Sequence, residues 1–173
     1  SGGDPLLQSK FMFEFLTACR SQGVHTAIET SACVPEDQFA AVLEIVDWLF
    51  IDLKHLDYRK HKLLTGPGNR VILNNTRLAS SILRARNKAL VIRMVIVPGI
   101  NDGDNIRDLA DFIKSLPFVS QVELLPYHRF GTYKYDLLGR QFPLPDVESP
   151  RSEQMEKICR YLEEQGIVVA SST

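Results

Sequence analysis

The strongest constraint on the fold is a regular alternation between short apolar runs and longer amphipathic stretches. The apolar runs occupy residues 24–30, 48–54, 90–99, 119–128 and 167–171. The third run, LVIRMVIVPG, is almost continuously apolar, as expected for a strand buried on both faces of a parallel sheet. Strands joined by helical crossovers of this length run parallel. The sequence therefore predicts an α/β fold, either an open doubly wound sheet or a (β/α) barrel.

The predicted helices carry ordinary start and stop signals. The first begins at Asp4 as N-cap, with Pro5 at the first helical position, and ends at Gly23. Its apolar residues recur at helical spacing and are Leu7, Phe11, Phe15 and Cys19. Further helices are predicted at residues 35–46, 58–64, 71–85, 106–116 and 149–165. Two glycines precede the first helix, a position that usually follows a strand, yet no strand precedes them here.

Composition limits the classes of function. Twenty Lys and Arg residues against 21 Asp and Glu residues give a net charge of −1, which favours neither nucleic acid nor a membrane surface as partner. No apolar run approaches the roughly 20 residues that span a bilayer, and no signal peptide is recognisable, so we expect a soluble, cytoplasmic protein. With 45% hydrophobic residues, residues 1–173 are predicted to form a single domain.

Polar or glycine-containing stretches end four of the predicted strands. In chain order they are Glu29 and Thr30, Asp52 and Lys54, Pro98 and Gly99, and His128. Parallel α/β folds keep their active sites at this edge, so an acid, a lysine, a glycine and a histidine could converge there. Each residue also has a purely structural interpretation, such as an ion pair between Asp52 and Lys54 or a loop position for His128.

Two charged residues lie inside predicted apolar strands, where a charge needs either a pairing partner or a functional role. Glu29 interrupts the first strand, and Arg93 lies between apolar residues of the third. We expect Arg93 either to pair with an acid or to line the cavity. By contrast, the remaining histidines lack metal-ligand spacing and are predicted at the surface: His25, His55 and His61.

Six short motifs, read in order, carry a family resemblance. They are GGD (2–4), ETSA (29–32), DLK (52–54), TGPGN (65–69), IRMVIVPGIND (92–102) and ELLPYH (123–128). The chain resembles the activating enzymes of glycyl-radical enzymes, the pyruvate formate-lyase activating enzyme type within the radical S-adenosylmethionine (SAM) superfamily. The resemblance covers almost the whole chain and implies a partial (β/α) barrel.

The resemblance also implies an activity. A four-iron four-sulfur cluster binds SAM and cleaves it reductively, and the resulting deoxyadenosyl radical takes hydrogen from a glycine of a partner glycyl-radical enzyme similar to pyruvate formate-lyase. A small electron donor such as flavodoxin or ferredoxin is the second implied partner.

The resemblance also implies roles at the methionine end of SAM for the residues that match the family motifs by position. The motif that receives the amino group is matched by Gly2, Gly3 and Asp4, with Glu29 and Thr30 beside it. Lys54 matches the lysine that faces the carboxylate. These residue types suit the ligand, because a zwitterionic methionine needs an acid at one end and a cation at the other.

The nucleoside end is matched by residues of the later strands. Asp52 and His128 match residues near the ribose, and Arg93 matches an arginine of the cavity wall. The turn beside the nucleoside is matched by Val97, Pro98 and Gly99.

The chain also departs from the family pattern. The CxxxCxxC motif that holds the cluster is absent, and Cys19, Cys33 and Cys159 are spaced 14 and 126 positions apart, too far to replace it. The motif GGD replaces the commoner GGE, and Ala32 occupies a position where the family often has glycine. We therefore expect the C-terminal part of a longer enzyme, without catalytic or metal-binding residues of its own, inactive alone. Its strand at 24–30 is predicted to expose an edge that could pair with another copy.

Two other classes of function remain open from the residues alone. One is a Schiff-base lyase in which Lys54 is the amine and Asp52 or Glu29 moves the proton. The other is a non-catalytic remnant that binds only a partner protein.

Overall fold

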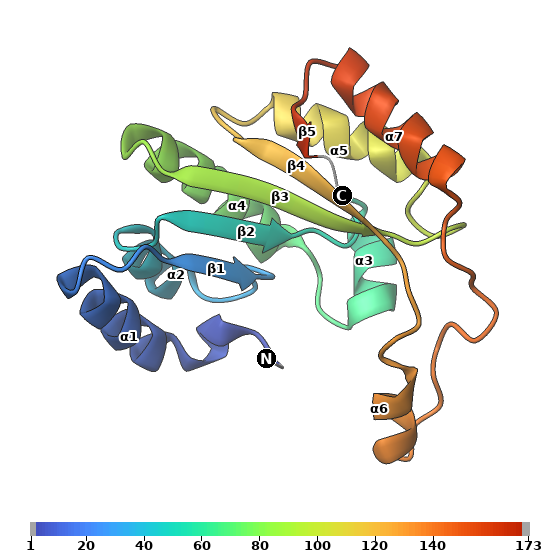
Figure 1. Cartoon of the computed structure of the whole chain (residues 1–173), viewed down its shortest axis with the longest axis horizontal. Coiled ribbons are helices and arrows are strands. Elements are labelled where there is room, and N and C mark those ends of the chain that lie inside the picture. The colour runs from blue at the N-terminus through green and yellow to red at the C-terminus, as the bar shows by residue number, and fades with distance from the viewer. Residues whose placement is uncertain (1–2, 171–173) are drawn as a thin grey trace.

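The fold is built on one five-stranded parallel sheet (Figure 1). We describe it from a computed structural model that covers residues 3–170. In spatial order the strands are β1 (Ala27–Thr30), β2 (Trp48–Asp52), β3 (Ala89–Ile96), β4 (Gln121–Pro126) and β5 (Val169–Ala170). Spatial order equals chain order because each crossover returns the chain to the next position along the sheet. The prediction of a parallel α/β sheet is confirmed.

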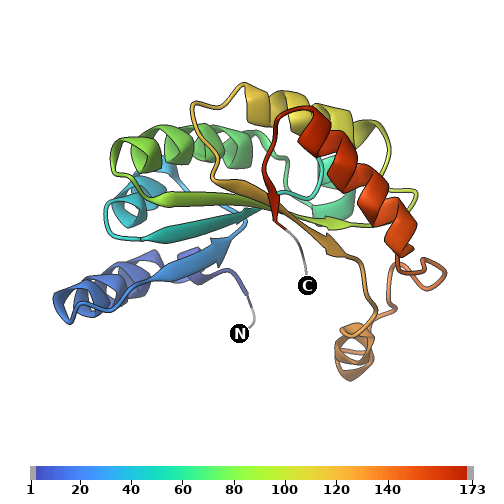
Figure 2. The same cartoon turned by 45° about the horizontal axis from the view of Figure 1, so that its top comes forward.

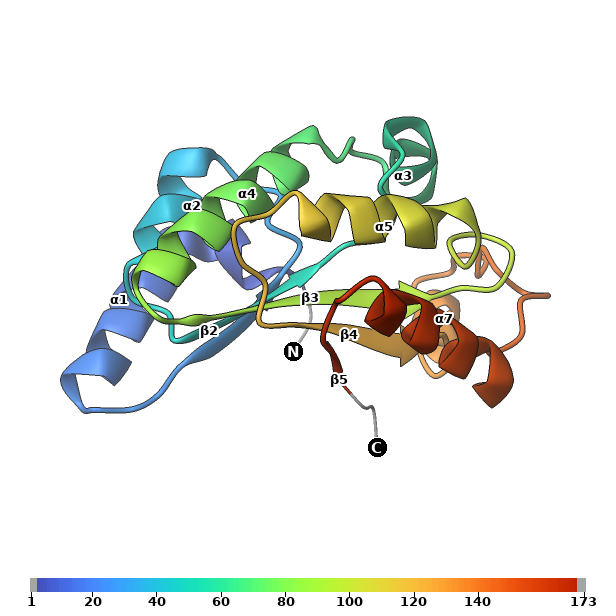
Figure 3. The same cartoon turned by 90° about the horizontal axis from the view of Figure 1, so that it is seen from above.

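The helices lie mainly on one face of this sheet. They are η1 (Pro5–Gln8), α1 (Ser9–Ser21), α2 (Glu36–Leu43), α3 (Tyr58–Thr65), α4 (Arg70–Ala85), α5 (Asp104–Lys114), α6 (Thr132–Leu137) and α7 (Ser152–Glu164). Figure 2 shows α2, α4 and α5 over one face, with the opposite face open between α1 and α6, and Figure 3 shows the same helices from above. A parallel sheet with helices outside and an open inner face is an incomplete (β/α) barrel.

The apolar core lies between the sheet and the outer helices. Buried strand residues such as Leu49, Ile51 and Ile92 belong to the same cluster as Phe39 of α2 and Leu109 of α5. Because strand side chains alternate between the two faces, the residues between these core positions point to the inner face. The sheet therefore packs apolar residues against the helices and carries its charged residues on the open side, beside apolar residues such as Phe50.

The helix at the β1 end of the sheet differs from its prediction. Phe11 and Phe15 stack on each other but are 60% and 51% exposed, and Leu7 belongs to η1 and is also exposed. The buried residue of α1 is Leu16, while Cys19 is only partly buried. α1 contacts α2 and η1 at the border of the layer, so only that side of the helix is covered. The predicted helix is confirmed, but most of the apolar residues that indicated it are exposed.

Two of the three histidines predicted at the surface are buried. His61 Nδ1 lies 3.0 Å from the Pro67 carbonyl oxygen and 3.1 Å from the Thr65 hydroxyl. His55 Nδ1 accepts the backbone N–H of Asp57, and burial is the main cause that lowers the pKa of His55. Local hydrogen bonds to the following turn satisfy both rings, which makes their burial tolerable.

Element boundaries account for the remaining differences. The first strand begins at Ala27 rather than residue 24, and the last helix begins at Ser152 rather than residue 149. The helix α6 lies in a stretch that carried no prediction. The last strand was predicted to extend to Ser171, which lies outside the described residues. Within residues 3–170 no helix combines the length and the hydropathy needed to cross a bilayer.

Candidate functional site

The parallel sheet brings most of the predicted residues to one edge. Glu29 and Thr30 are the last residues of β1, and Asp52 is the last residue of β2. Lys54 and His128 follow the ends of β2 and β4 by two residues. Strands that run in one direction end at one edge, so the loops carrying these residues are neighbours. Gly2 lies outside the described residues.

Asp4 is the centre of a hydrogen-bond cluster at the end of β1. Its carboxylate accepts hydrogen bonds from the Thr30 hydroxyl at 2.8 Å, from the Ser31 N–H at 2.8 Å and from the Ser31 hydroxyl at 2.7 Å. It also caps η1 by accepting the Leu6 N–H. Burial raises the pKa of Asp4, but the hydrogen bonds from Ser31, Leu6 and Thr30 outweigh it, so this pKa lies below its usual value. Asp4 is thus held as a carboxylate against the loop after β1.

Arg93 on β3 contacts side chains of three other strands across the inner face. Its Nε lies 2.5 Å from Glu123 on β4, its NH1 pairs with Glu29 on β1, and the guanidinium lies 4.6 Å from the ring centroid of Phe50 on β2. Burial disfavours the charged guanidinium, but the bonds to both carboxylates raise the pKa of Arg93 above its usual value. We expected Arg93 either to pair with an acid or to line the cavity, and it pairs with two acids.

Asp52 and Lys54 form an ion pair at the end of β2, with Nζ to Oδ2 at 2.5 Å. The other carboxylate oxygen, Oδ1 of Asp52, is buried and has no hydrogen-bond donor among the described residues. Buried carboxylate oxygens are normally satisfied. One acceptor of Asp52 is therefore available to a bound group.

An open pocket of about 810 Å³ joins these clusters. Its wall contains five of the predicted residues: Gly3, Asp4, Glu29, Thr30 and Asp52. Glycine is favoured at Gly3, where φ is +74°. The pocket also includes Phe11 of α1 and Ser31, which were not predicted to line it.

The other predicted residues of the described range 3–170 lie on β3 or on adjoining loops and do not line this pocket. Lys54 and Arg93 form ion pairs with Asp52 and Glu29, respectively, and these two carboxylates line the pocket. The turn Val97, Pro98 and Gly99 follows β3, and Gly99 has φ +74°. His128 is exposed and stacks on Phe130 with ring centroids 4.4 Å apart.

Sequence reasoning missed three partners of the charged groups. Ser31 bonds Asp4 twice, Glu123 provides the second carboxylate to Arg93, and Phe50 lies against the guanidinium. A signal for Glu123 was present, because it alternates with apolar Val122 and Leu124 as an inner-face residue does. Ser31 belongs to the ETSA motif, although only its first two residues were assigned roles.

The described residues do not fit an iron–sulfur cluster. Cys19 lies in α1, Cys33 in the loop after β1, and Cys159 in α7. Such clusters need several thiolates close together. Across residues 3–170 no group of three or more His, Cys, Asp or Glu residues is arranged to hold a metal ion.

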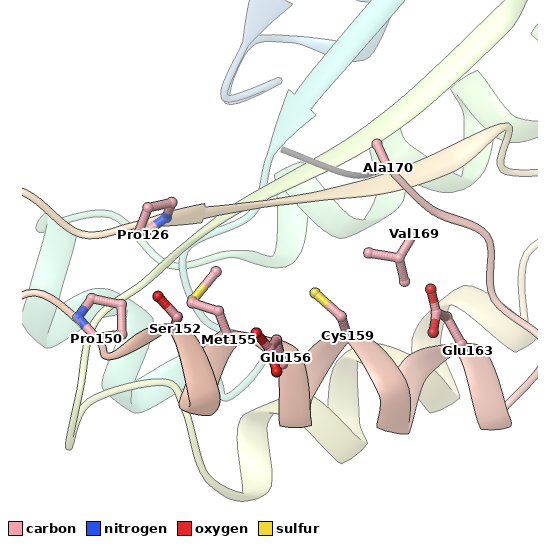
Figure 4. A pocket seen from close by; sticks show the side chains of 9 residues that line it. All are labelled: Pro126, Pro150, Ser152, Met155, Glu156, Cys159, Glu163, Val169 and Ala170. Carbon is pink, nitrogen blue, oxygen red and sulfur yellow. The ribbon is translucent and has the colours of Figure 1, made fainter. Parts of the chain in front are cut away.

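A second pocket of about 410 Å³ lies between α7 and strands β4 and β5 (Figure 4). Met155 and Cys159 point from α7 toward the sheet, and Glu163 lies at one end. Burial, reinforced by Glu163, raises the pKa of the Cys159 thiol, which disfavours a reactive thiolate. None of the predicted site residues lines this pocket.

The sheet and the edge residues define a class first. A parallel α/β arc with ionisable groups at the C-terminal ends of its strands is the architecture of barrel enzymes. Comparison with known families is specific: the family described as the Radical SAM superfamily matches residues 1–113. The chain belongs to the radical SAM superfamily, as its motifs indicated.

Two similar proteins indicate which members of this superfamily the chain resembles. The 4-hydroxyphenylacetate decarboxylase activating enzyme of Clostridioides difficile is 42% identical over 163 residues, covering 91% of this chain and 50% of that enzyme. The pyruvate formate-lyase-activating enzyme of Staphylococcus aureus (strain USA300) is 38% identical over 173 residues, covering 96% of this chain and 67% of that enzyme. The chain spans about half the length of the first of these relatives.

A solved structure shows the same architecture. The crystal structure of a domain of pyruvate-formate lyase-activating enzyme from Bacteroides vulgatus ATCC 8482 aligns with a TM-score of 0.79 and 27% identity. The match covers 98% of this chain and 94% of that chain. The two folds therefore match over nearly the whole length of both chains.

Proposed function

We propose that the C-terminal edge of the sheet binds SAM and that the whole protein activates a glycyl-radical enzyme. The observation that carries this proposal is the pocket shared by Asp4, Glu29, Thr30 and Asp52 in a chain of the radical SAM superfamily. The similarity to two activating enzymes supports the class of partner.

The charge of the site suits a cationic ligand. Four carboxylates, Asp4, Glu29, Asp52 and Glu123, face two cations, Lys54 and Arg93, so the cluster has a formal charge of −2. SAM carries a sulfonium, an ammonium and a carboxylate, and is therefore a net cation. Charge complementarity of this kind favours SAM over its demethylated, neutral product.

Both ends of the methionine have a reachable partner. The Glu29 side chain is 53% exposed and the Lys54 side chain is 43% exposed, although each already forms an ion pair. A side chain this exposed can share its charge with a ligand group at less cost than a buried one. The ligand ammonium would share Glu29 with Arg93, and the ligand carboxylate would share Lys54 with Asp52.

The chemistry of the proposed reaction is divided between this chain and other groups. SAM would supply a nucleoside radical once one electron from outside the described residues breaks its carbon–sulfur bond and releases methionine, and that radical would take hydrogen from a glycine of the partner. The residues described here bind and orient the methionine end. Because they do not fit an iron–sulfur cluster, we propose that this chain alone is inactive.

The test is a calorimetric titration of the chain with SAM and with S-adenosylhomocysteine. We expect Glu29→Gln to weaken SAM binding about tenfold, which corresponds to about 1.4 kcal/mol for one lost charge-assisted contact. Glu44→Gln is the matched control, because Glu44 pairs with exposed Arg86 away from the site. Equal binding of both ligands, or equal effects of both substitutions, would contradict the proposal.

The Schiff-base alternative is less well supported by the geometry. Lys54 donates to Asp52, and an ion-paired ammonium has no lone pair with which to attack a carbonyl. Borohydride trapping of a small aldehyde on Lys54 would favour that alternative. A remnant that binds only a protein partner predicts no SAM binding at all.

A further inference from the structure

The loops at this edge of the sheet are held by four buried asparagines. Asn69, Asn75, Asn101 and Asn105 are each at most 3% exposed. Each donates from its side-chain amide to a backbone carbonyl, in most cases of a loop that follows a strand. Burying an amide is costly unless it is hydrogen-bonded, so these side chains strongly favour one arrangement of the loops.

Asn101 joins two of the loops that carry predicted SAM-binding residues. Its Nδ2 donates to the Lys54 carbonyl oxygen at 3.1 Å and to the Val95 carbonyl oxygen at 2.8 Å. Its Oδ1 accepts the backbone N–H of Val97 at 2.8 Å. One side chain therefore contacts both the loop after β2 and the turn after β3.

The loop after β2 is also fixed from two other directions. Asn105 Oδ1 accepts the Leu56 N–H at 2.7 Å, and Asn69 Nδ2 donates to the Leu56 carbonyl oxygen at 2.6 Å. Asn105 Nδ2 in turn lies 3.4 Å from the Asn101 carbonyl oxygen. The backbone from Lys54 to Leu56 is thus part of one connected amide network.

We propose that Asn101 is a positioning residue, which fixes Lys54 relative to the turn of Val97, Pro98 and Gly99. This inference rests on the proposed function, in which Lys54 faces the methionine carboxylate and the turn lies beside the nucleoside. Asn101 itself does not have to touch the ligand. It sets the distance between the two binding loops before the ligand arrives, which reduces the entropy lost on binding.

The decisive variant is Asn101→Asp, which is nearly isosteric. It keeps an oxygen acceptor for the Val97 N–H but replaces the amide donor with an oxygen that faces two carbonyl oxygens. The turn after β3 should therefore stay in place while Lys54 is released. Ser80→Ala is the matched control, since Ser80 is fully buried and its hydroxyl makes two bonds to Phe118, away from the strand C-termini.

Amide hydrogen exchange tests the coupling without any ligand. In Asn101→Asp we expect exchange at Leu56 to accelerate about tenfold, the effect of losing one buried hydrogen bond, although the direct partner of Leu56 is Asn105. Exchange at Val97 should remain slow. Ser80→Ala should leave Leu56 unchanged. Unchanged exchange at Leu56 in Asn101→Asp would overturn the inference.

Ligand affinity separates positioning from a general loss of structure. Asn101→Asp should weaken SAM about tenfold but leave 5′-methylthioadenosine, which lacks the amino and carboxylate groups, unchanged. A parallel loss for both ligands would overturn the inference. If the unmodified chain binds neither ligand, the proposed function fails, and the exchange at Leu56 still decides whether Asn101 couples the two loops.

Discussion

Arg93 and Glu123 stand opposite each other in the register of β3 and β4, with Nε of Arg93 2.5 Å from Oε2 of Glu123. Glu29 binds the same guanidinium from the other side. On the inner face, one guanidinium therefore pairs with two carboxylates from two other strands.

Replacing this cation should destabilise the fold. Arg93→Gln leaves Glu29 and Glu123 without a positive partner, and we expect the free energy of unfolding to fall by about 2 kcal/mol in urea titrations. Arg86→Gln removes an exposed ion pair with Glu44 and should cost less than about 0.5 kcal/mol. Similar losses in both variants would show that the ion pairs of Arg93 contribute no more to the free energy of unfolding than an exposed pair does.

The stability of the protein should fall in acid partly through Asp47. The Lys88 ammonium, helped by hydrogen bonds from Thr26, lowers the pKa of Asp47 from 3.8 to about 2. A carboxyl whose pKa is lower in the folded state stabilises the fold above pH 3.8, and this contribution is lost as the pH falls through 2.

Asp47→Asn measures this contribution directly. At neutral pH the variant should be less stable by about 1 to 2 kcal/mol, after allowance for solvent screening, and the difference should shrink between pH 4 and pH 2. Denaturant titrations across this range provide the measurement. A difference that stays constant with pH would mean that Asp47 titrates normally in the folded protein.

The hydrogen bonds that Asp4 accepts should keep its pKa low. Thr30→Val keeps the side-chain shape but removes the hydroxyl that donates to Asp4 and accepts the Ala32 N–H. We expect the pKa of Asp4, followed by NMR, to rise, and stability to fall by about 1 to 2 kcal/mol. Thr17→Val is the control, because the Thr17 hydroxyl bonds only the Phe13 carbonyl oxygen on exposed α1.

The β1 side of the sheet remains the predicted place for self-association. Among residues 3–170, β1 pairs only with β2, and Phe11 and Phe15 are exposed on the neighbouring helix. Phe11→Ser combined with Phe15→Ser should reduce association in light scattering without lowering stability. Leu16→Ala, on the buried side of the same helix, should cost about 3 kcal/mol. A strict monomer at high concentration for the unmodified chain would argue against this interface.

The strand positions and the polar edge were predictable because their signals are local. The apolar runs gave the strands, and the anomalous charges at Glu29 and Arg93 marked the inner face correctly. A charge inside an apolar strand must be compensated, whatever the rest of the chain does.

Features that depend on distant packing could not be predicted. The spacing of Phe11 and Phe15 identifies a helix face, but not whether another element covers it. Likewise, the partners of Asn101 are backbone groups of two loops, and a single sequence carries no pattern for loop paths. The roles of His128 and of the turn at Val97 stay predictions from the family resemblance.

An NMR titration of the isotope-labelled chain with SAM tests the central claim most directly. We predict that the backbone amide signals of Asp4, Thr30, Asp52 and Lys54 shift together with one binding curve, while those of Cys159 and its neighbours in α7 do not. Shifts confined to the α7 pocket, or no shifts at millimolar SAM, would contradict the assignment of this sheet edge as a SAM-binding site.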